Sequence, residues 1–146
     1  MNFAPTSASA REAHGTGALA EWSQAFLRSE GGNLGVANPL RERHGDVYVL
    51  AEVALSDVYP ISGPDEDFDW PVPPAEFEQK VEAMVRLFDE GWDAPPLFVH
   101  MDTLRLVDGN HRREALLRLG RQTYWAVMWY RRPAFNGRGQ PVSLDE

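Results

Sequence analysis

The arrangement of apolar residues predicts two amphipathic helices in the first 90 residues of the chain. Between positions 74 and 90 the apolar side chains fall at i, i+4, i+7, i+8 and i+11, which places five of them on one stripe: Phe77, Val81, Met84, Val85 and Phe88. Prolines precede this segment and Gly91 follows it, as is common where a helix begins and ends. A shorter apolar stripe predicts a second helix over 16–29.

Alternating and short apolar runs predict four strands. In DVYVLAEVAL (46–55) the apolar side chains of one face are Val47, Val49, Ala51 and Val53. The runs PLFVH, TLRLV and TYWAVMWY predict three more strands, and a helix over 110–119 lies before the last of them. The resulting order of elements predicts a small α+β domain, with a mixed sheet packed against helices.

The remaining segments lack such patterns. Residues 1–15 are small and polar and are predicted to form a flexible N-terminal arm. Residues 16–45 then make a helical extension followed by a Gly-rich linker, GGNLGVANP. An acidic, Pro-rich loop follows the first strand over 56–74, and 131–146 is a polar C-terminal tail.

Composition narrows the classes of function. The length of 146 residues suits one domain, and the formal net charge of −8 argues against general nucleic-acid binding. The chain has no cysteine, which excludes disulfides, thiolate metal sites and cysteine catalysis. No apolar run approaches a membrane span and the first residues do not resemble a secretory signal, so we expect no membrane partner and a cytoplasmic protein.

The stretch LVDGNHRREALLRLG, residues 106–120, carries the candidate chemistry. A His and two Arg occupy the first turn of the predicted helix, where the helix dipole favours negative charge. The free N–H groups of that turn and these side chains together predict a phosphate site, formed by Gly109, Asn110, His111, Arg112 and Arg113. Arg112 shares the apolar face of the helix and therefore needs a partner, which an acidic side chain of the chain itself could also supply.

The same region resembles a known superfamily. The segment LRLVDGNHRREALLRLGRQTYWAVMW closely resembles the signature of ParB N-terminal and sulfiredoxin-like domains, and the likeness extends over residues 46–130. This resemblance implies a ParB/sulfiredoxin-like nucleotide-binding domain. It also implies that the turn from Gly109 to Arg112 holds ATP or ADP, or CTP, together with Mg²⁺.

The residues of the turn distinguish the branches of this superfamily. Sulfiredoxins carry a catalytic Cys where this chain has Asn110, so sulfinic acid repair is excluded. The DGNHRR turn is most similar to the Asp-Gly-His-His-Arg type of the free-serine kinases. That resemblance implies that Asp108 lies near a substrate hydroxyl or metal, and that an acidic residue of the 56–74 loop, Asp65 or Glu66, is the general base.

The sequence therefore predicts a nucleotide-dependent phosphotransferase that acts on a small hydroxyl-bearing metabolite. The alternative is a ParB-like nucleotide-binding switch or interaction module without kinase activity. A nuclease is a third possibility, against which the acidic charge argues. The sequence assigns no metal ligands and no oligomeric state.

Overall fold

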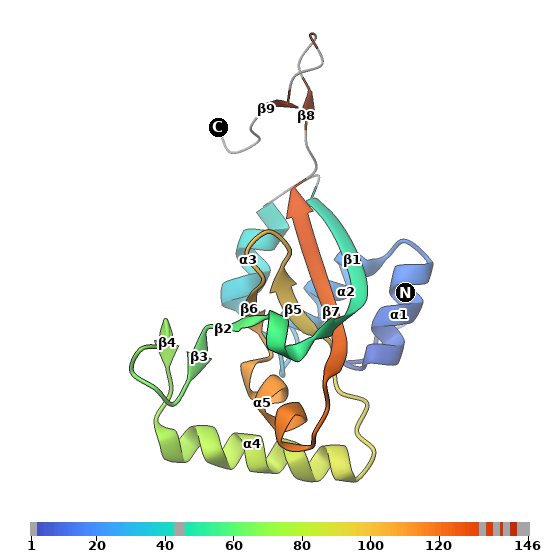
Figure 1. The fold of residues 1–146 in the computed structure, drawn as a ribbon. Coiled ribbons are helices and arrows are strands. Elements are labelled where there is room, and N and C mark those ends of the chain that lie inside the picture. The colour runs from blue at the N-terminus through green and yellow to red at the C-terminus, as the bar shows by residue number, and fades with distance from the viewer. Residues whose placement is uncertain (1–2, 43–45, 132–133, 136–137, 139–140, 143–146) are drawn as a thin grey trace.

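The structure is a computed structural model that describes residues 3–42, 46–131, 134–135, 138 and 141–142. Its central feature is a five-stranded sheet in the order β1-β7-β5-β6-β2. The strands are β1 (Asp46–Ala54), β2 (Tyr59–Pro60), β5 (Leu97–His100), β6 (Arg105–Asp108) and β7 (Thr123–Arg131). The sheet is mixed, because β7 is antiparallel to β1 and parallel to β5. The predicted α+β class with a mixed sheet is confirmed (Figure 1).

The two helices that follow β1 pack together beside one face of the sheet. Helix α4 (Pro74–Asp89) covers the predicted segment almost residue for residue, and α5 (Asn110–Arg118) packs against it. Phe77 and Val81 on α4 meet Ala115 on α5 in a small buried cluster. The apolar stripe predicted for 74–90 thus faces a helix, as a surface helix of a mixed domain requires.

Three N-terminal helices cover the opposite face of the sheet: α1 (Ser7–Gly15), α2 (Leu19–Leu27) and α3 (Leu34–Glu42). Side chains alternate along β7, so Val127 and Trp129 point toward these helices while Tyr124 and Ala126 point to the other face. The rings of Trp22, Phe26 and Phe98 stack in sequence between α2 and β5. These helices are part of the core of the domain.

The prediction of a flexible arm over 1–15 was therefore wrong for residues 7–15, which form α1. The side-chain hydroxyl of Ser7 donates to the carbonyl of Ala94 at 2.7 Å, and the hydroxyl of Tyr124 donates to the same carbonyl at 2.7 Å. The linker predicted over 31–39 was also wrong, because most of it lies in α3. Pro39, inside that helix, explains why the sequence argued against one there.

The segment predicted as an acidic loop over 56–74 contains the end of a one-turn helix (Leu55–Asp57), the edge strand β2 of the central sheet, and the short paired strands β3 (Ser62–Gly63) and β4 (Trp70–Pro71). Arg131, the first residue of the predicted tail, ends β7, and the described residues beyond it include β8 (Ala134–Phe135) and β9 (Pro141–Val142). Residues 132–133, 136–137, 139–140 and 143–146 lie outside the described residues. No helix in the described part of the chain has the length and apolar character that a membrane span requires.

The packing of α2 generates a test of whether the N-terminal helices belong to the cooperative core. Trp22 is fully buried, and its indole Nε1 donates to the Ser9 hydroxyl at 3.0 Å. Trp22→Ala should lower the free energy of unfolding by about 3–5 kcal/mol, because it leaves a large cavity between helices and sheet. Denaturant unfolding followed by circular dichroism measures this loss.

The matched control is Trp70→Ala, because Trp70 is 68% exposed. We expect it to change the free energy of unfolding by no more than about 0.5 kcal/mol. Equal effects of the two substitutions would contradict the placement of α2 in the core.

Candidate functional site

The DGNHRR turn connects β6 directly to α5. β6 ends at Asp108, and Gly109 precedes the helix with a φ of 104°, in the left-handed region that favours glycine. A Cβ added at Gly109 would lie 2.7 Å from a Leu97 methyl and 2.9 Å from Arg112 Nη2. Any other residue would be strained at this φ and would also displace the Leu97 or Arg112 side chain, so the position favours glycine for both reasons.

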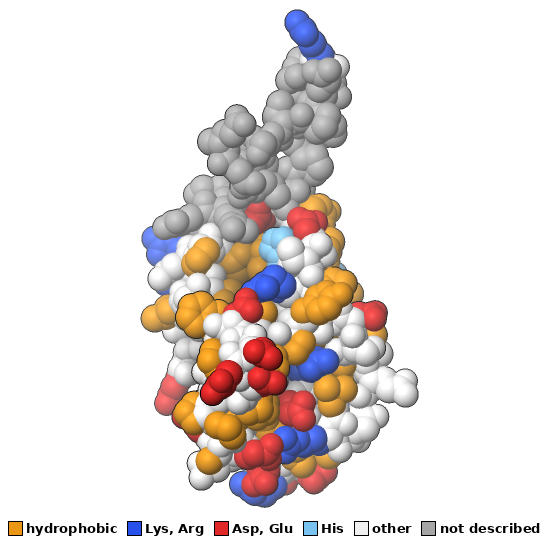
Figure 2. Space-filling model, turned by 60° about the vertical axis from the view of Figure 1, so that its left-hand side comes forward, with side chains coloured by type: hydrophobic (Ala, Val, Ile, Leu, Met, Phe, Trp, Pro, Cys, Tyr) orange, Lys and Arg blue, Asp and Glu red, His pale blue; other side chains and the backbone are white. Residues whose placement is uncertain are grey.

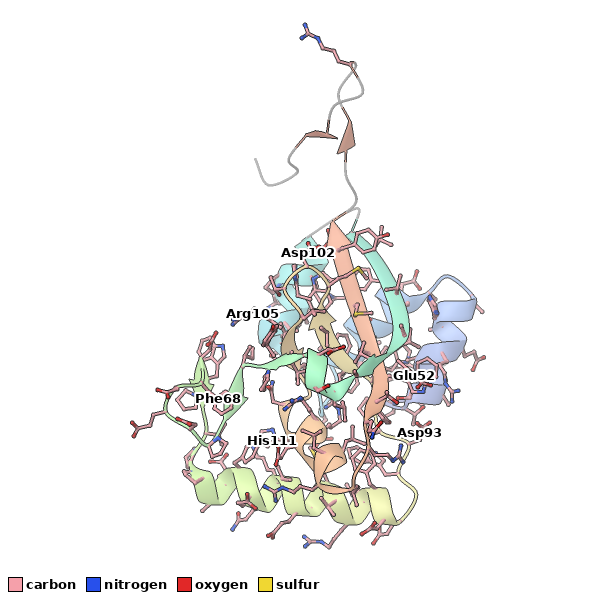
Figure 3. The ribbon with its side chains drawn as sticks, in the orientation of Figure 1. Glu52, Phe68, Asp93, Asp102, Arg105 and His111 are labelled. Atoms are coloured by element: carbon pink, nitrogen blue, oxygen red, sulfur yellow. The ribbon has the colours of Figure 1, made fainter. Side chains whose placement is uncertain are left out.

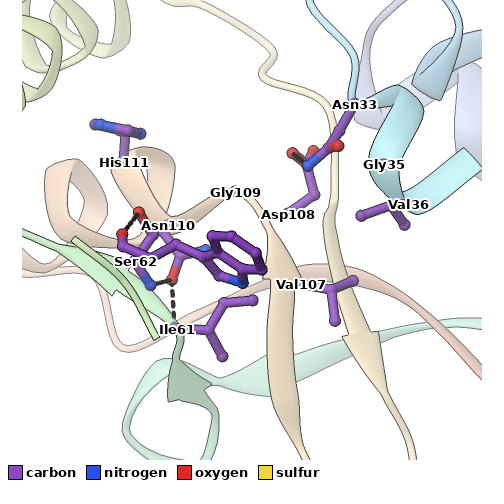
Figure 4. A pocket seen from close by; sticks show the side chains of 11 residues that line it. Asn33, Gly35, Val36, Ile61, Ser62, Val107, Asp108, Gly109, Asn110 and His111 are labelled. Atoms are coloured by element: carbon purple, nitrogen blue, oxygen red, sulfur yellow. Dashed lines mark hydrogen bonds between the residues drawn. The ribbon is translucent and has the colours of Figure 1, made fainter. Parts of the chain in front are cut away.

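A cavity of about 520 Å³ lies at this turn. This first cavity is lined by residues from three places in the chain: the start of α3, the segment around β3 and β4, and the end of β6 with the start of α5 (Figure 4). The lining residues are Asn33, Gly35, Val36, Ile61, Ser62, Trp70, Val107, Asp108, Gly109, Asn110 and His111. Its volume falls within the range of small-molecule sites, roughly 300–1,000 Å³.

Two helices begin at the first cavity. The N–H groups of Val36 and Ala37 donate to the Asn33 carbonyl at the start of α3, and the Arg113 N–H donates to the Gly109 carbonyl at the start of α5. No side chain caps α5 by a hydrogen bond. The N–H groups before these donors have no acceptor within the helix, and the helix dipole gives each N-terminus a partial positive charge. Both helices therefore direct partial positive charge toward this region.

Asn110, a predicted ligand donor, has a structural task in the first cavity. Its side-chain Oδ1 accepts hydrogen bonds from the N–H groups of Ile61 at 2.9 Å and Ser62 at 3.3 Å. Its Nδ2 donates to the Leu106 carbonyl at 3.1 Å. These bonds, two of which Figure 4 draws, fix one wall of the cavity to the start of α5.

Arg112 points away from the first cavity and does not line it. The side chain is buried, with the residue 6% exposed, and its Nη2 donates to the Pro96 carbonyl at 3.0 Å and to Asp108 Oδ2 at 3.3 Å. The partner expected for an inward Arg is therefore a carboxylate of the turn itself. The guanidinium predicted to bind phosphate is instead paired with Asp108.

Arg113 also lies outside the lining of the first cavity. Its Nε donates to the Leu55 carbonyl at 2.9 Å, and burial lowers the pKa of its guanidinium from the usual high value. The side chain thus joins α5 to the one-turn helix after β1. Of the five residues predicted to bind phosphate, Gly109, Asn110 and His111 line the cavity and the two arginines do not.

His111 faces the first cavity from α5 while its ring packs against Phe77 of α4, with 5.0 Å between ring centroids. Figure 3 shows this side chain between the two helices. Burial lowers the pKa of His111 below its usual value, and the positive charges of Lys80 and Arg112 lower it further. Its Nε2 is buried without a hydrogen-bond partner among the described residues. Burial thus favours the neutral form of the imidazole, and the ring keeps one nitrogen without a partner among the described residues.

Asp108 is the acidic residue that lines the first cavity. Its Oδ1 accepts a hydrogen bond from Asn33 Nδ2 at 3.5 Å; Figure 4 shows both side chains. Its Oδ2 accepts from Arg112 Nη2. The Arg112 charge compensates the carboxylate, so an anion entering the cavity would meet a neutral ion pair and not a free carboxylate.

Asp65 and Glu66, predicted as candidate general bases, are exposed on the loop between β3 and β4 and do not line the first cavity. Asp65 lines a shallow depression with Asp67, Phe68 and Asp69 instead. Figure 3 shows Phe68 on this loop, which projects from the sheet. Among the described residues no group of three or more His, Asp or Glu side chains is arranged to hold a metal ion.

The surface seen in Figure 2 is electrostatically mixed. Acidic and basic side chains alternate with apolar ones across this face, and no continuous basic area covers it. Such a face does not offer the basic stripe that tracks a phosphate backbone.

Seven residues of the first cavity were missed by sequence reasoning: Asn33, Gly35, Val36, Ile61, Ser62, Trp70 and Val107. The first three fell in the predicted linker, the next three in the predicted acidic loop, and Val107 in a predicted strand. One available signal was the length of that loop, since a long loop in a small domain is often functional. The glycines of GGNLGVANP gave the opposite signal, because they favour a linker.

Neither a protein-family model nor a curated protein sequence matches this chain. A solved structure described as "Structure of the C2221 form of Pnob8-like ParB-N domain" is similar to it, with 17% sequence identity and a TM-score of 0.40. The similarity covers 57% of this chain and 30% of that chain.

Proposed function

We propose that the first cavity binds a nucleotide, ATP or ADP or alternatively CTP, by its phosphate groups. The observation that carries this proposal is the convergence of two helix N-termini, those of α3 and α5, on one cavity of about 520 Å³. Backbone N–H groups at a helix start bind phosphate well, because several donors and the dipole act together. The resemblance of the turn to a nucleotide-binding signature supports the same assignment.

The rest of the lining suits a nucleoside. Val36, Ile61 and Val107 provide apolar surface, and Trp70 adds a large exposed ring at the same cavity. Stacking of a base on an aromatic side chain contributes about 1–3 kcal/mol. Ser62 and Asn33 supply polar groups that could orient the sugar or base.

Mg²⁺ fits this cavity only together with the phosphates. Asp108 supplies one carboxylate, and Mg²⁺ is commonly held by one or two carboxylates with phosphate oxygens and water. When bound, the ion would neutralise phosphate charge. Asp108 would hold it only by sharing its carboxylate between the ion and Arg112.

Phosphoryl transfer to a small hydroxyl-bearing molecule is the second candidate function, and the position of Asp108 favours it. In this reaction the acceptor oxygen bonds to the γ-phosphorus of ATP, the bond to the bridging oxygen breaks, ADP leaves, and Asp108 takes the hydroxyl proton. Asp65 and Glu66, which were predicted as general bases for transfer, do not line the cavity. Nucleotide binding without transfer requires no general base, so it is the function proposed first.

An added negative charge tests the binding proposal. Asn33→Asp keeps the shape of the side chain and places a carboxylate at the first cavity, so the affinity for ATP and ADP should fall by about tenfold or more. Isothermal titration calorimetry in buffer with Mg²⁺ measures the change.

Asn38→Asp is the matched control, since Asn38 is exposed on the same helix and bonds to Arg28 outside the cavity. It carries the same change in charge and should bind like the wild-type protein. Wild-type affinity in both variants, or no binding of ATP, ADP or CTP by the wild-type protein, would contradict the proposal.

The titration of His111 provides a second test. Burial holds the pKa of His111 below its usual value in the free protein, and a bound phosphate would favour the charged imidazolium. The pKa should therefore rise when ADP binds, and by linkage ADP affinity should increase as pH falls through that range. NMR titration of the imidazole resonances, assigned with His111→Gln, measures the pKa of His111 in the free and in the ADP-bound protein. A pKa that stays constant at saturating ADP would place the phosphates elsewhere.

Asp108→Asn separates binding from transfer. The substitution should leave ATP affinity within a few-fold of wild type and reduce transfer by about 100-fold or more, because the proton acceptor is lost. Labelled ATP with a pool of hydroxyl metabolites measures transfer. Because the substitution leaves the buried Arg112 without its carboxylate partner, we expect a lower melting temperature, and a thermal melt checks that the variant is folded at the assay temperature. A wild-type protein that binds ATP but transfers no label to any acceptor would rule out the second candidate.

A further inference from the structure

A second cavity, of about 380 Å³, lies on the other side of the Arg112 side chain. It is bounded by the first residues of the chain, the end of α2, helix α4 and the segment before β5. Most of its wall is apolar or aromatic, with Phe3, Phe26, Met84 and Trp92 among the lining residues. None of the residues assigned to nucleotide binding above lines it, so this cavity is separate from the first.

Arg112 gives this apolar cavity a buried cation. The residue is 6% exposed and lines the second cavity, and its guanidinium carbon lies 5.8 Å from the centre of the Phe26 ring. The recorded bonds of the guanidinium to Pro96 and Asp108 both come from Nη2. Nε is buried without a partner among the described residues. A buried guanidinium with unused donors is costly unless another acceptor satisfies them.

We propose that the second cavity binds a small apolar carboxylate. The planar carboxylate matches the fork of donors on Arg112, and an aromatic or aliphatic body matches the walls. Two acidic groups limit the ligand to one negative charge. Asp108 already compensates part of the Arg112 charge, and Glu30 is exposed at the margin of the cavity. A phosphate dianion would be repelled more strongly by both than a carboxylate.

Glu30 also distinguishes two classes of ligand that carry a carboxylate and an apolar body. A simple organic acid would use Arg112 and the apolar wall alone, whereas an apolar α-amino acid would additionally place its ammonium group near Glu30. Phenylacetate and phenylalanine are probes that share the ring and the carboxylate and differ in the amine. Preferential binding of phenylalanine that disappears in Glu30→Gln identifies an amino acid, and equal binding identifies an organic acid.

The central experiment compares phenylacetate with phenylacetamide by NMR titration of the full chain. The two probes have nearly the same shape, and only the first carries the charge that Arg112 would pair with. Phenylacetate should bind at least tenfold more tightly, because charge-assisted hydrogen bonds are the stronger kind. Equal affinity for the two probes, or no binding of phenylacetate, would overturn the proposal.

Arg112→Gln removes the cation, but Asp108 then loses its partner and the variant could fail to fold. Gly31→Trp keeps the ion pair and adds a bulky side chain at a residue that lines the second cavity. A Cβ added at Gly31 meets nothing within 4 Å, so the backbone accepts the substitution. Gly15→Trp is the matched control, because a Cβ there also meets nothing within 4 Å and Gly15 does not line the cavity.

Gly31→Trp should weaken phenylacetate binding at least tenfold, and Gly15→Trp should not change it. Unchanged affinity in Gly31→Trp would overturn the assignment of the site. Binding of a carboxylate in the second cavity does not depend on nucleotide binding in the first. ATP titration of the same two variants tests this independence. ATP affinity should be equal in both, since neither position lines the first cavity.

Discussion

The ion pair between Arg112 and Asp108 determines how the turn between β6 and α5 is built. The two residues are one helical turn apart, with Gly109 between them in the left-handed conformation. Arg112 also donates to the Pro96 carbonyl before β5, so a single guanidinium joins α5 to two neighbouring strand segments. Removing one partner of a buried pair costs about 3–5 kcal/mol, because the other charge is left without compensation. Gly109 is fixed by the same arrangement, because any larger residue would displace Arg112 or Leu97.

This pair separates two cavities of different chemical character. In the first, the positive potential comes from backbone N–H groups at the starts of α3 and α5, and the lining contains no arginine. In the second, the positive charge is the Arg112 guanidinium itself, set among aromatic side chains. Backbone donors suit the spread charge of phosphates, whereas a guanidinium among apolar walls suits a small carboxylate. Because Arg112 and Asp108 are bonded to each other, the two cavities meet at one shared interaction.

The N-terminal helices complete both cavities. Asn33 and Val36 at the start of α3 line the first, and Phe26 at the end of α2 lines the second. The same segment forms much of the core on one face of the sheet, where Trp22 is fully buried. The N-terminal helices lie outside the segment 46–130 that resembles the superfamily, and they nevertheless supply one side of each candidate site. Loss of these helices would expose the sheet and open the cavities together.

The sequence alone determined the local structure of the four longer strands of the central sheet and of α2, α4 and α5, and also the need of Arg112 for a partner. Periods of two and of 3.6 residues follow from backbone geometry, so the strand at 46–54 and the helix at 74–89 were predictable from their own side chains. Only the tertiary structure decided that Arg112 turns away from the first cavity, that Asp65 stays outside it, and that Asn33 comes within 3.5 Å of Asp108, 75 residues away. Periodicity specifies which face of an element is buried. It does not specify which distant segment covers that face, because that choice depends on the packing of the whole core.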